Sequence, residues 1–261
     1  MGGEINPNFN LDANHHSVPK FYLKQWANAH NLVKVTRVSD QSVSYKSPKS
    51  LTASRNFYTA TFSDGRKDSS AEQIFSSIEN DAIRVFRSIM SEPIAWPPSD
   101  YDKVKLCAFT AYQATRVTKY KDAVAAVLEA KLAQLESSFS SLEIDKTNLH
   151  IQAIAAASDP YALDLLRQNM GLFITSERVL NTSDNPVIRN VNYLNLQTPL
   201  TSAFPIRSTL IPLNPSMLLA FFGDAELDCT KPFTLTTEMA EHLNQLQRNN
   251  AQDFIYSVGI D

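Results

Sequence analysis

Hydrophobic residues recur along this chain with two different periods. Between about residue 69 and residue 169 they return every three or four positions, which is typical of amphipathic helices. On either side of that region the apolar runs are short or alternate with polar residues, which is typical of strands. The expected strands cover residues 32–38, 42–45, 56–62, 172–175, 178–180, 187–188, 209–211, 217–222 and 254–256. The pattern predicts an α+β fold with a helical central region packed on a mostly antiparallel β-sheet.

Local signals place the ends of the expected helices. Ser69 and Glu72 form a capping-box pattern, so one helix is expected to begin there and to end before Pro93. Ser99 followed by Asp102 predicts a second helix, which continues to about residue 137. Further helices are expected over residues 148–169, with a break near Pro160, and from Thr236 to Ala251.

The N-terminal part carries a distinctive stretch. Residues 1–13 are polar and without a period, and we expect a loosely ordered arm there. The next ten residues read Asn-His-His-Ser-Val-Pro-Lys-Phe-Tyr-Leu, from Asn14 to Leu23. Pro19 suits the first turn of a helix, because the N–H that it lacks has no intrahelical partner at that position. The paired histidines are therefore expected to lead directly into a short helix.

Composition narrows the class of protein. The chain has 261 residues, of which 43% are hydrophobic and 20% charged, as in an ordinary globular protein of one large or two small domains. Its two cysteines form no pair motif, and no signal peptide is evident, so we expect a reducing, cytoplasmic environment. The longest apolar run, residues 217–222, is too short to cross a membrane, so we expect a soluble protein without a membrane partner.

Charge is unevenly distributed. Residues 1–67 carry nine Lys or Arg and four acidic residues, a formal charge of +5, whereas the remainder carries −8. The same N-terminal quarter is rich in aromatic residues, a combination that is compatible with binding nucleic acid. The alternative, with the aromatic residues in the core and the lysines on a solvated face, is the more common arrangement in proteins.

His15 and His16 lead the candidates for chemistry, because histidine titrates near neutral pH and serves as acid, base or metal ligand. Adjacent residues of an extended chain point to opposite sides, so only one of them is expected to face a given site. His16, which is nearer the helix, is the stronger candidate. The alternative is that one ring bonds nearby backbone groups and the other is solvated.

Two helical segments add carboxylate, amide and guanidinium groups. Glu79 borders the apolar stripe of its helix and is expected either to pair with a buried base or to act as an acid or base. Glu72, on the same side, is assigned to the capping box. Gln113 and Arg116 lie on one face of the next helix, where Arg116 suits either a phosphate or an ion pair with Glu79, and we favour the ion pair.

The turn at residues 182–187 is a second concentration of polar groups. Asp184 and Asn185, before Pro186, have the composition of a turn whose side chains bond their own backbone. A carboxylate at a strand end is also placed to orient a histidine or to hold a metal. No zinc motif, glycine-rich phosphate loop, nucleophile elbow or dinucleotide fingerprint is present, which disfavours the enzyme classes that depend on them.

These stretches together resemble one family of bacterial and viral proteins, named domain of unknown function 4238. The resemblance covers nearly the whole chain, and its specific elements are the Asn14–Leu23 stretch and the Ser183-Asp184-Asn185-Pro186 turn. Weaker matches lie at residues 56–58, 72–79, 113–116, 211–215 and 244–257, and Asn214 departs from the serine that is usual there. The resemblance implies a single domain over residues 1–261 with one assembled polar site, and it implies no particular activity.

The leading hypothesis from the sequence is a hydrolase of phosphate-containing substrates, a nuclease-like effector in conflict between phage and bacterium. His16, His15, Glu79 and Asp184 are its candidate catalytic residues. Substrate contacts are expected from Lys20, Tyr22, Gln113, Arg116 and Asn185. If a divalent ion takes part, Mg²⁺ or Mn²⁺ held by Asp184 and Glu79 is expected. The alternative is a non-catalytic binding protein in which these polar residues form a structural network.

Overall fold

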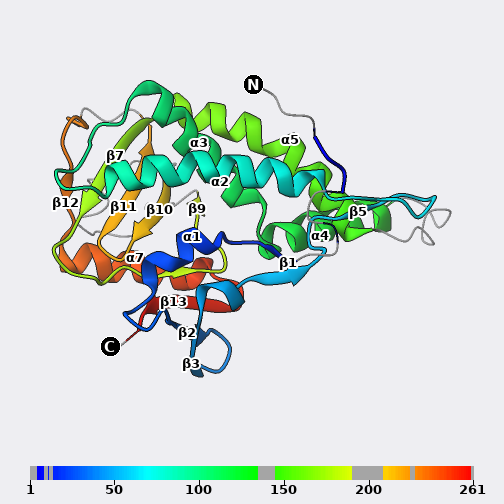
Figure 1. The fold of residues 1–261 in the computed structure, drawn as a ribbon, viewed down its shortest axis with the longest axis horizontal. Coiled ribbons are helices and arrows are strands. Elements are labelled where there is room, and N and C mark those ends of the chain that lie inside the picture. The colour runs from blue at the N-terminus through cyan, green and yellow to red at the C-terminus, as the bar shows by residue number, and fades with distance from the viewer. Residues whose placement is uncertain are drawn as a thin grey trace.

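The computed structural model describes residues 5–8, 11, 14–134, 145–189, 208–223 and 227–259. Within these ranges the chain is α+β, with long helices packed against mostly antiparallel sheets (Figure 1). Helix α3 lies between α2 and α5 and contacts both. The α-helices are α1 (Lys20–Leu23), α2 (Ser70–Ile89), α3 (Asp100–Thr115), α4 (Thr118–Gln134), α5 (Lys146–Leu166) and α7 (Thr237–Asn250), and two 3₁₀ turns are η1 (Lys24–Trp26) and η2 (Pro48–Ser50).

The larger sheet has five strands in the order β12-β7-β11-β10-β9, all antiparallel except the parallel pair β12–β7. The strands are β7 (Asn169–Ile174), β9 (Ile188–Arg189), β10 (Thr209–Asn214), β11 (Met217–Phe222) and β12 (Phe233–Thr234). Leu218 and Phe222 of β11 pack toward Leu243 of α7, whereas Leu219 and Phe221 pack into the core that α3 shares. Both faces of this sheet are covered, which explains why β11 is apolar at every position.

The smaller sheet joins the two ends of the described chain. Its order is β3-β2-β13-β8, with β13 (Phe254–Val258) between β2 (Val33–Arg37) and β8 (Thr182–Ser183), and β3 (Val43–Lys46) at one edge. Two short ribbons complete the fold, β1 (Asn14–His16) with β4 (Ala53–Arg55) and β5 (Ala60–Thr61) with β6 (Lys67–Asp68). Within the described residues, no helix is both long and apolar enough to cross a membrane.

Two buried aromatic residues connect the segment α1–η1 to the sheets. The Tyr22 hydroxyl donates to the carbonyl oxygen of Pro212 at 2.7 Å and lies 2.8 Å from the Thr182 hydroxyl. The Trp26 indole N–H donates to the carbonyl oxygen of Leu180 at 2.8 Å. Burial raises the pKa of Tyr22, so the phenol stays protonated and remains a donor. The residues after the paired histidines are therefore held by β8, by β10 and by the segment that leads into β8.

Several expected element boundaries are wrong. Helix α5 continues through Pro160, and the single helix expected over residues 99–137 ends at Thr115 and restarts at Thr118. The expected strand at 56–62 is reduced to β5, because Tyr58 is turned into the core, and residues 178–180 form no strand. The expected N-terminal arm and the end of the second helix lie partly outside the described residues.

The expected capping box does not form. Ser69 makes no side-chain cap to the helix and donates its hydroxyl to the carbonyl oxygen of Pro7 at 3.0 Å. The carboxylate of Asp68 instead accepts the N–H of Ser70 at 2.7 Å. Glu72 is consequently not engaged at the helix start.

We expect Tyr22→Phe to lower the free energy of unfolding by about 1–3 kcal/mol, because it leaves the buried Pro212 carbonyl without its donor. Chemical denaturation of the two proteins measures the difference. Tyr101→Phe is the matched control, since Tyr101 is 71% exposed and should show no change. Equal losses in the two variants would contradict the role assigned to the Tyr22 hydroxyl.

Candidate functional site

The two histidines of β1 face opposite sides, as the sequence predicts. His15 is fully buried, its ring stacks on that of Tyr58, and its Nδ1 accepts the N–H of Tyr58 at 3.0 Å. His16 is partly exposed, and its Nε2 lies 3.1 Å from the carbonyl oxygen of Lys49. Because a carbonyl oxygen only accepts, the Nε2 of His16 carries the hydrogen. The Nδ1 of neutral His16 has no partner among the described residues, so this nitrogen is left as a base.

Arg116 is the centre of a buried polar network. Its guanidinium is 3% exposed and donates to Glu79 Oε1 and to the carbonyl oxygen of His16, both at 2.6 Å. The hydroxyl of Tyr58 donates back to the carbonyl oxygen of Arg116 at 2.7 Å. These bonds join α2, α3, β1 and the segment after β4, and they confirm the expected ion pair between Arg116 and Glu79.

Aromatic rings and a second carboxyl group complete the surroundings of Arg116. The guanidinium carbon lies 4.8 Å from the ring centre of Phe75 and 5.6 Å from that of Tyr58, within the range of a cation–π interaction. Burial opposes the charged form, but the neighbouring Tyr58 and Glu79 outweigh this effect and raise the pKa of Arg116. The residue is therefore a permanent buried cation that donates to Tyr58, Glu79 and the His16 carbonyl oxygen.

Glu72 is a candidate that sequence reasoning assigned only to a helix cap. Burial raises the pKa of its carboxyl group to about 7, Arg116 lowers it, and the like charge of Glu79 adds to the increase. Its Oε2 is buried and has no hydrogen-bond partner among the described residues. A carboxyl group that titrates near neutral pH beside a guanidinium has the properties of an acid or base. The signal in the sequence was its seven-residue spacing from Glu79 on one helix face.

Tyr22 and Gln113, expected to contact a substrate, do not reach solvent. Tyr22 is fully buried and Gln113 is 1% exposed, with its Nε2 donating to the carbonyl oxygen of Ser17 at 3.0 Å. That expectation is wrong for both, because both side chains are packed in the core between α1 and α3 and the elements around them. His150 of α5 is also fully buried, and burial lowers its pKa to about 4.

Asp184 and Asn185 hold the connection between α7 and β13. The Asp184 carboxylate accepts the backbone N–H groups of Gln252, Asp253 and Phe254 at 2.7–3.0 Å. Asn185 donates to the carbonyl oxygen of Asn250 at 3.0 Å. The sequence predicted bonds within the turn itself, whereas most of these bonds go to a segment 65–70 residues away. Burial raises the pKa of Asp184, and the three N–H bonds oppose that shift.

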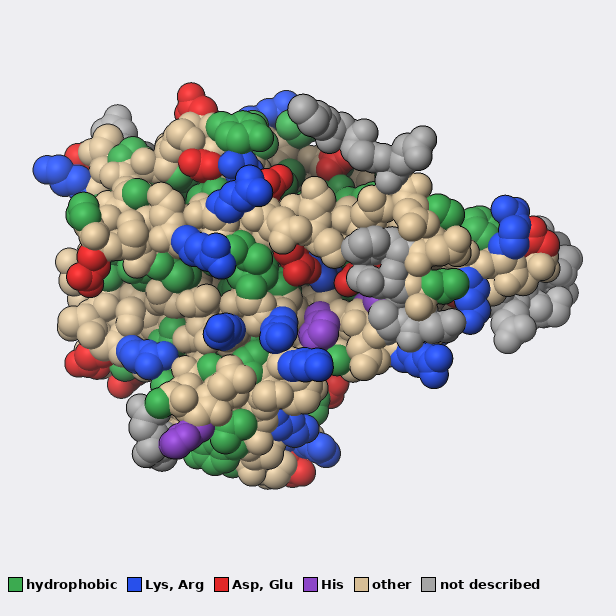
Figure 2. All heavy atoms as spheres, viewed as in Figure 1, with side chains coloured by type: hydrophobic (Ala, Val, Ile, Leu, Met, Phe, Trp, Pro, Cys, Tyr) green, Lys and Arg blue, Asp and Glu red, His purple; other side chains and the backbone are tan. Residues whose placement is uncertain are grey.

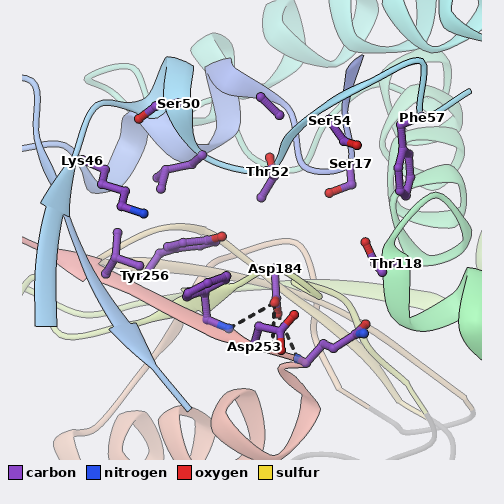
Figure 3. Close-up of a pocket in the computed structure, with 15 residues that line it drawn as sticks. Ser17, Lys46, Ser50, Thr52, Ser54, Phe57, Thr118, Asp184, Asp253 and Tyr256 are labelled. Carbon is purple, nitrogen blue, oxygen red and sulfur yellow. Dashed lines mark hydrogen bonds between the residues drawn. The ribbon is translucent and has the colours of Figure 1, made fainter. Parts of the chain in front are cut away.

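Asp184 also borders a cavity of about 250 Å³. Figure 3 shows Ser17, Thr52 and Ser54 on one side, with Asp184 and Asp253 on the other. Lys46 extends into the cavity from β3 and Thr118 from the start of α4. The side chains of His16, Glu79 and Arg116 are not part of its lining. Ser17 nevertheless directly follows His16, so the cavity and the buried network share the backbone of one segment.

A basic face lies over the N-terminal elements. Figure 2 shows Lys and Arg side chains gathered over α1 and η2, which contact each other. Lys20, Lys24 and Lys49, which make up this lysine cluster, are exposed, and none of them forms an ion pair with a described residue. Lys49 is the residue whose carbonyl oxygen bonds His16. Positive charge is therefore available to a ligand beside the one solvent-reaching histidine of β1.

The expected divalent-ion site is not assembled from the described side chains. Glu79 is bonded to Arg116, and both carboxylate oxygens of Asp184 accept backbone N–H groups. In the part of the chain that the structure describes, no three His, Cys, Asp or Glu side chains gather as a metal site would require. Asp184 and Glu79 therefore act as partners of protein donors in this conformation.

We expect Arg116→Met to lower the free energy of unfolding by about 3 kcal/mol, because it leaves a half-buried Glu79 carboxylate and a backbone carbonyl without their donors. The double variant Arg116→Met/Glu79→Gln should recover part of this loss in denaturant unfolding. Arg66→Met is the control, since the Arg66–Asp64 pair is exposed and solvent-screened and its loss should change stability little. A control loss as large as that of Arg116→Met would contradict the network.

Glu72→Gln should change the pH dependence of stability. The folded-state pKa of about 7 lies above the ordinary value of 4.5, so the native state holds the proton more tightly than the unfolded chain. Wild-type stability should therefore fall as pH rises from about 4.5 to about 7, by on the order of 3 kcal/mol from this group. The Gln variant should lack that component in unfolding curves across this range, whereas Glu92→Gln, at an exposed position, should retain it. Parallel pH profiles of wild type and Glu72→Gln would refute the shifted pKa.

Comparison with known proteins supports the grouping suggested by the paired histidines and the polar turn. No curated protein and no solved structure matches the chain significantly. A family match covers residues 14–258, from the first residue of β1 to the last residue of β13. The chain therefore belongs to the family described as Protein of unknown function (DUF4238).

Proposed function

We propose that the protein is a hydrolase of phosphate-containing substrates and that nucleic acid is its substrate. The observation that carries this proposal is the exposed lysine cluster, which forms no ion pair with a described residue, beside the Nδ1 of His16, which has no partner in the described part of the chain. Lysine ammonium groups neutralise phosphate charge, and binding of this kind supplies most of the affinity for a nucleic-acid backbone. A histidine next to such a surface is placed to move a proton during phosphodiester cleavage.

In the proposed reaction, the Nδ1 of His16 takes a proton from the attacking water molecule. The attacking oxygen bonds the phosphorus, the bond from phosphorus to the leaving oxygen breaks, and the leaving oxygen takes a proton from solvent. Lys20, Lys24 and Lys49 hold the phosphate and stabilise the charge that develops on its oxygens. Arg116 and Glu79 are positioning residues, because Arg116 fixes the His16 backbone through its carbonyl oxygen.

A non-catalytic binding protein is the second candidate, and one observation favours it. Arg116 donates to Glu79 and to the His16 carbonyl oxygen, and both carboxylate oxygens of Asp184 accept backbone N–H groups, which is how a structural network uses buried polar groups. The lysine cluster would then hold a nucleic acid without cleaving it. Both candidates predict that the protein binds nucleic acid, and they differ in whether the nucleic acid is cleaved.

The test combines cleavage and binding assays on labelled single-stranded RNA, single-stranded DNA and duplex DNA, with Mg²⁺, Mn²⁺ or a chelator. We expect cleavage by the wild type and a loss of about 100-fold or more in His16→Ala. The triple variant Lys20→Ala/Lys24→Ala/Lys49→Ala should bind more weakly and with a flatter dependence on salt. The control triple changes Lys131, Lys146 and Lys231, which are exposed outside this cluster, and should bind as the wild type does.

Salt-dependent binding without cleavage under every condition would overturn the hydrolase proposal in favour of the binding protein. Cleavage that is equal in wild type and His16→Ala would remove the histidine from the mechanism. Binding that is equal in the two triple variants would refute the assigned face.

A further inference from the structure

The cavity beside Asp184 contains polar groups that the protein itself does not use. Tyr256 is 1% exposed, and its hydroxyl group points into the cavity (Figure 3). Among the described residues, the hydroxyl oxygens of Tyr256, Ser17, Ser54 and Thr118 have no hydrogen-bond partner, although all four residues line the cavity. A buried phenol usually finds a partner for its O–H group, so an unpartnered one that faces a cavity indicates a ligand or solvent site.

The fixed charges of the cavity favour a ligand without net negative charge. Asp184 and Asp253 line one side, and the only cationic group in the described lining is Lys46. The two carboxylates are close enough for Asp253 to disfavour ionisation of Asp184. An anion would meet this repulsion, whereas a hydroxyl group of a ligand donates to a carboxylate at little cost. This cavity therefore differs in charge from the lysine cluster over α1 and η2.

Size and shape restrict the ligand further. A volume of about 250 Å³ lies at the lower end of ligand pockets, whose usual range is about 300–1,000 Å³. The ring of Phe57 stands at one end of the cavity and offers an apolar surface (Figure 3). An aromatic surface beside several hydroxyl groups and carboxylates matches a small ring that carries hydroxyl groups at its edge and an apolar face.

We propose that this cavity binds a neutral sugar ring, either as a free monosaccharide or as the ribose of a nucleoside. The ring hydroxyls donate to the Asp253 carboxylate and exchange hydrogen bonds with the Tyr256 hydroxyl, and the apolar face of the ligand lies against Phe57. Lys46 donates to a ring or hydroxyl oxygen. The site is separate from the proposed hydrolase chemistry and does not depend on it.

The test measures binding of adenosine, 2′-deoxyadenosine, glucose and inorganic phosphate to the full chain by calorimetry and by ligand-observed NMR. We expect saturable binding of adenosine or of glucose, and which of the two binds identifies the source of the sugar. Inorganic phosphate should not compete for the site. If adenosine binds, 2′-deoxyadenosine should bind more weakly, because it lacks one hydroxyl group.

Tyr256→Phe removes the phenol oxygen alone and should weaken sugar binding by about tenfold. Tyr101→Phe, at an exposed tyrosine outside the cavity lining, is the matched control and should bind as the wild type does. Thermal unfolding of both variants verifies that each is folded. Cleavage or binding of nucleic acid at the lysine cluster should be unchanged in Tyr256→Phe, so the two proposals fail independently.

Absence of saturable binding for both adenosine and glucose would overturn the inference. Binding that is equally strong in wild type and folded Tyr256→Phe would overturn it as well. Competition by inorganic phosphate would show that the site selects an anion and would refute the assigned ligand class.

Discussion

A single buried cation, the guanidinium of Arg116, holds together the part of the molecule that carries the histidines. It bonds a carboxylate of α2 and a backbone carbonyl of β1, and it lies against the rings of Phe75 and Tyr58. Removing such a charge from water is costly, so its position is fixed by the bonds that compensate that cost. The backbone position of His16 and the packing of Tyr58 follow from where this charge is held, whereas the pKa of Glu72 is raised by burial against the influence of the same charge.

The sequence predicted those features that local spacing encodes. The unbroken apolar run of residues 217–222 identified the strand β11, and the helical positions of Glu79 and Arg116 identified their ion pair. Features that depend on distant partners were not predictable in this way. Ser69 has a capping-box neighbour in the sequence, but a carbonyl oxygen 62 residues earlier takes its hydroxyl group. Without a role in a cap, the Glu72 side chain interacts with the charge of Arg116. Residue spacing along the chain does not predict this interaction.

The candidate site was predicted in its components and not in its arrangement. His16 and Asp184 belong to neighbouring parts of the fold, yet His16 faces the lysine cluster while Asp184 faces the cavity. The hydroxyl groups of the cavity come from β13, from the start of α4 and from the segments around β1 and β4, which are up to 239 residues apart between Ser17 and Tyr256. Single serine, threonine and tyrosine residues form no recognisable sequence motif, so the cavity that they line can be identified only from the folded structure.

The strand order of the smaller sheet has a consequence for the way the chain assembles. Strand β13 lies between β2 and β8, and these two strands do not pair with each other. During synthesis, β2 and β3 can pair as soon as they are made, but the inner edge of β2 stays open until about 220 further residues have followed. The N-terminal quarter, with its lysines and histidines, therefore pairs with β13 late in synthesis. The side of the cavity that Asp253 and Tyr256 line forms in the same step.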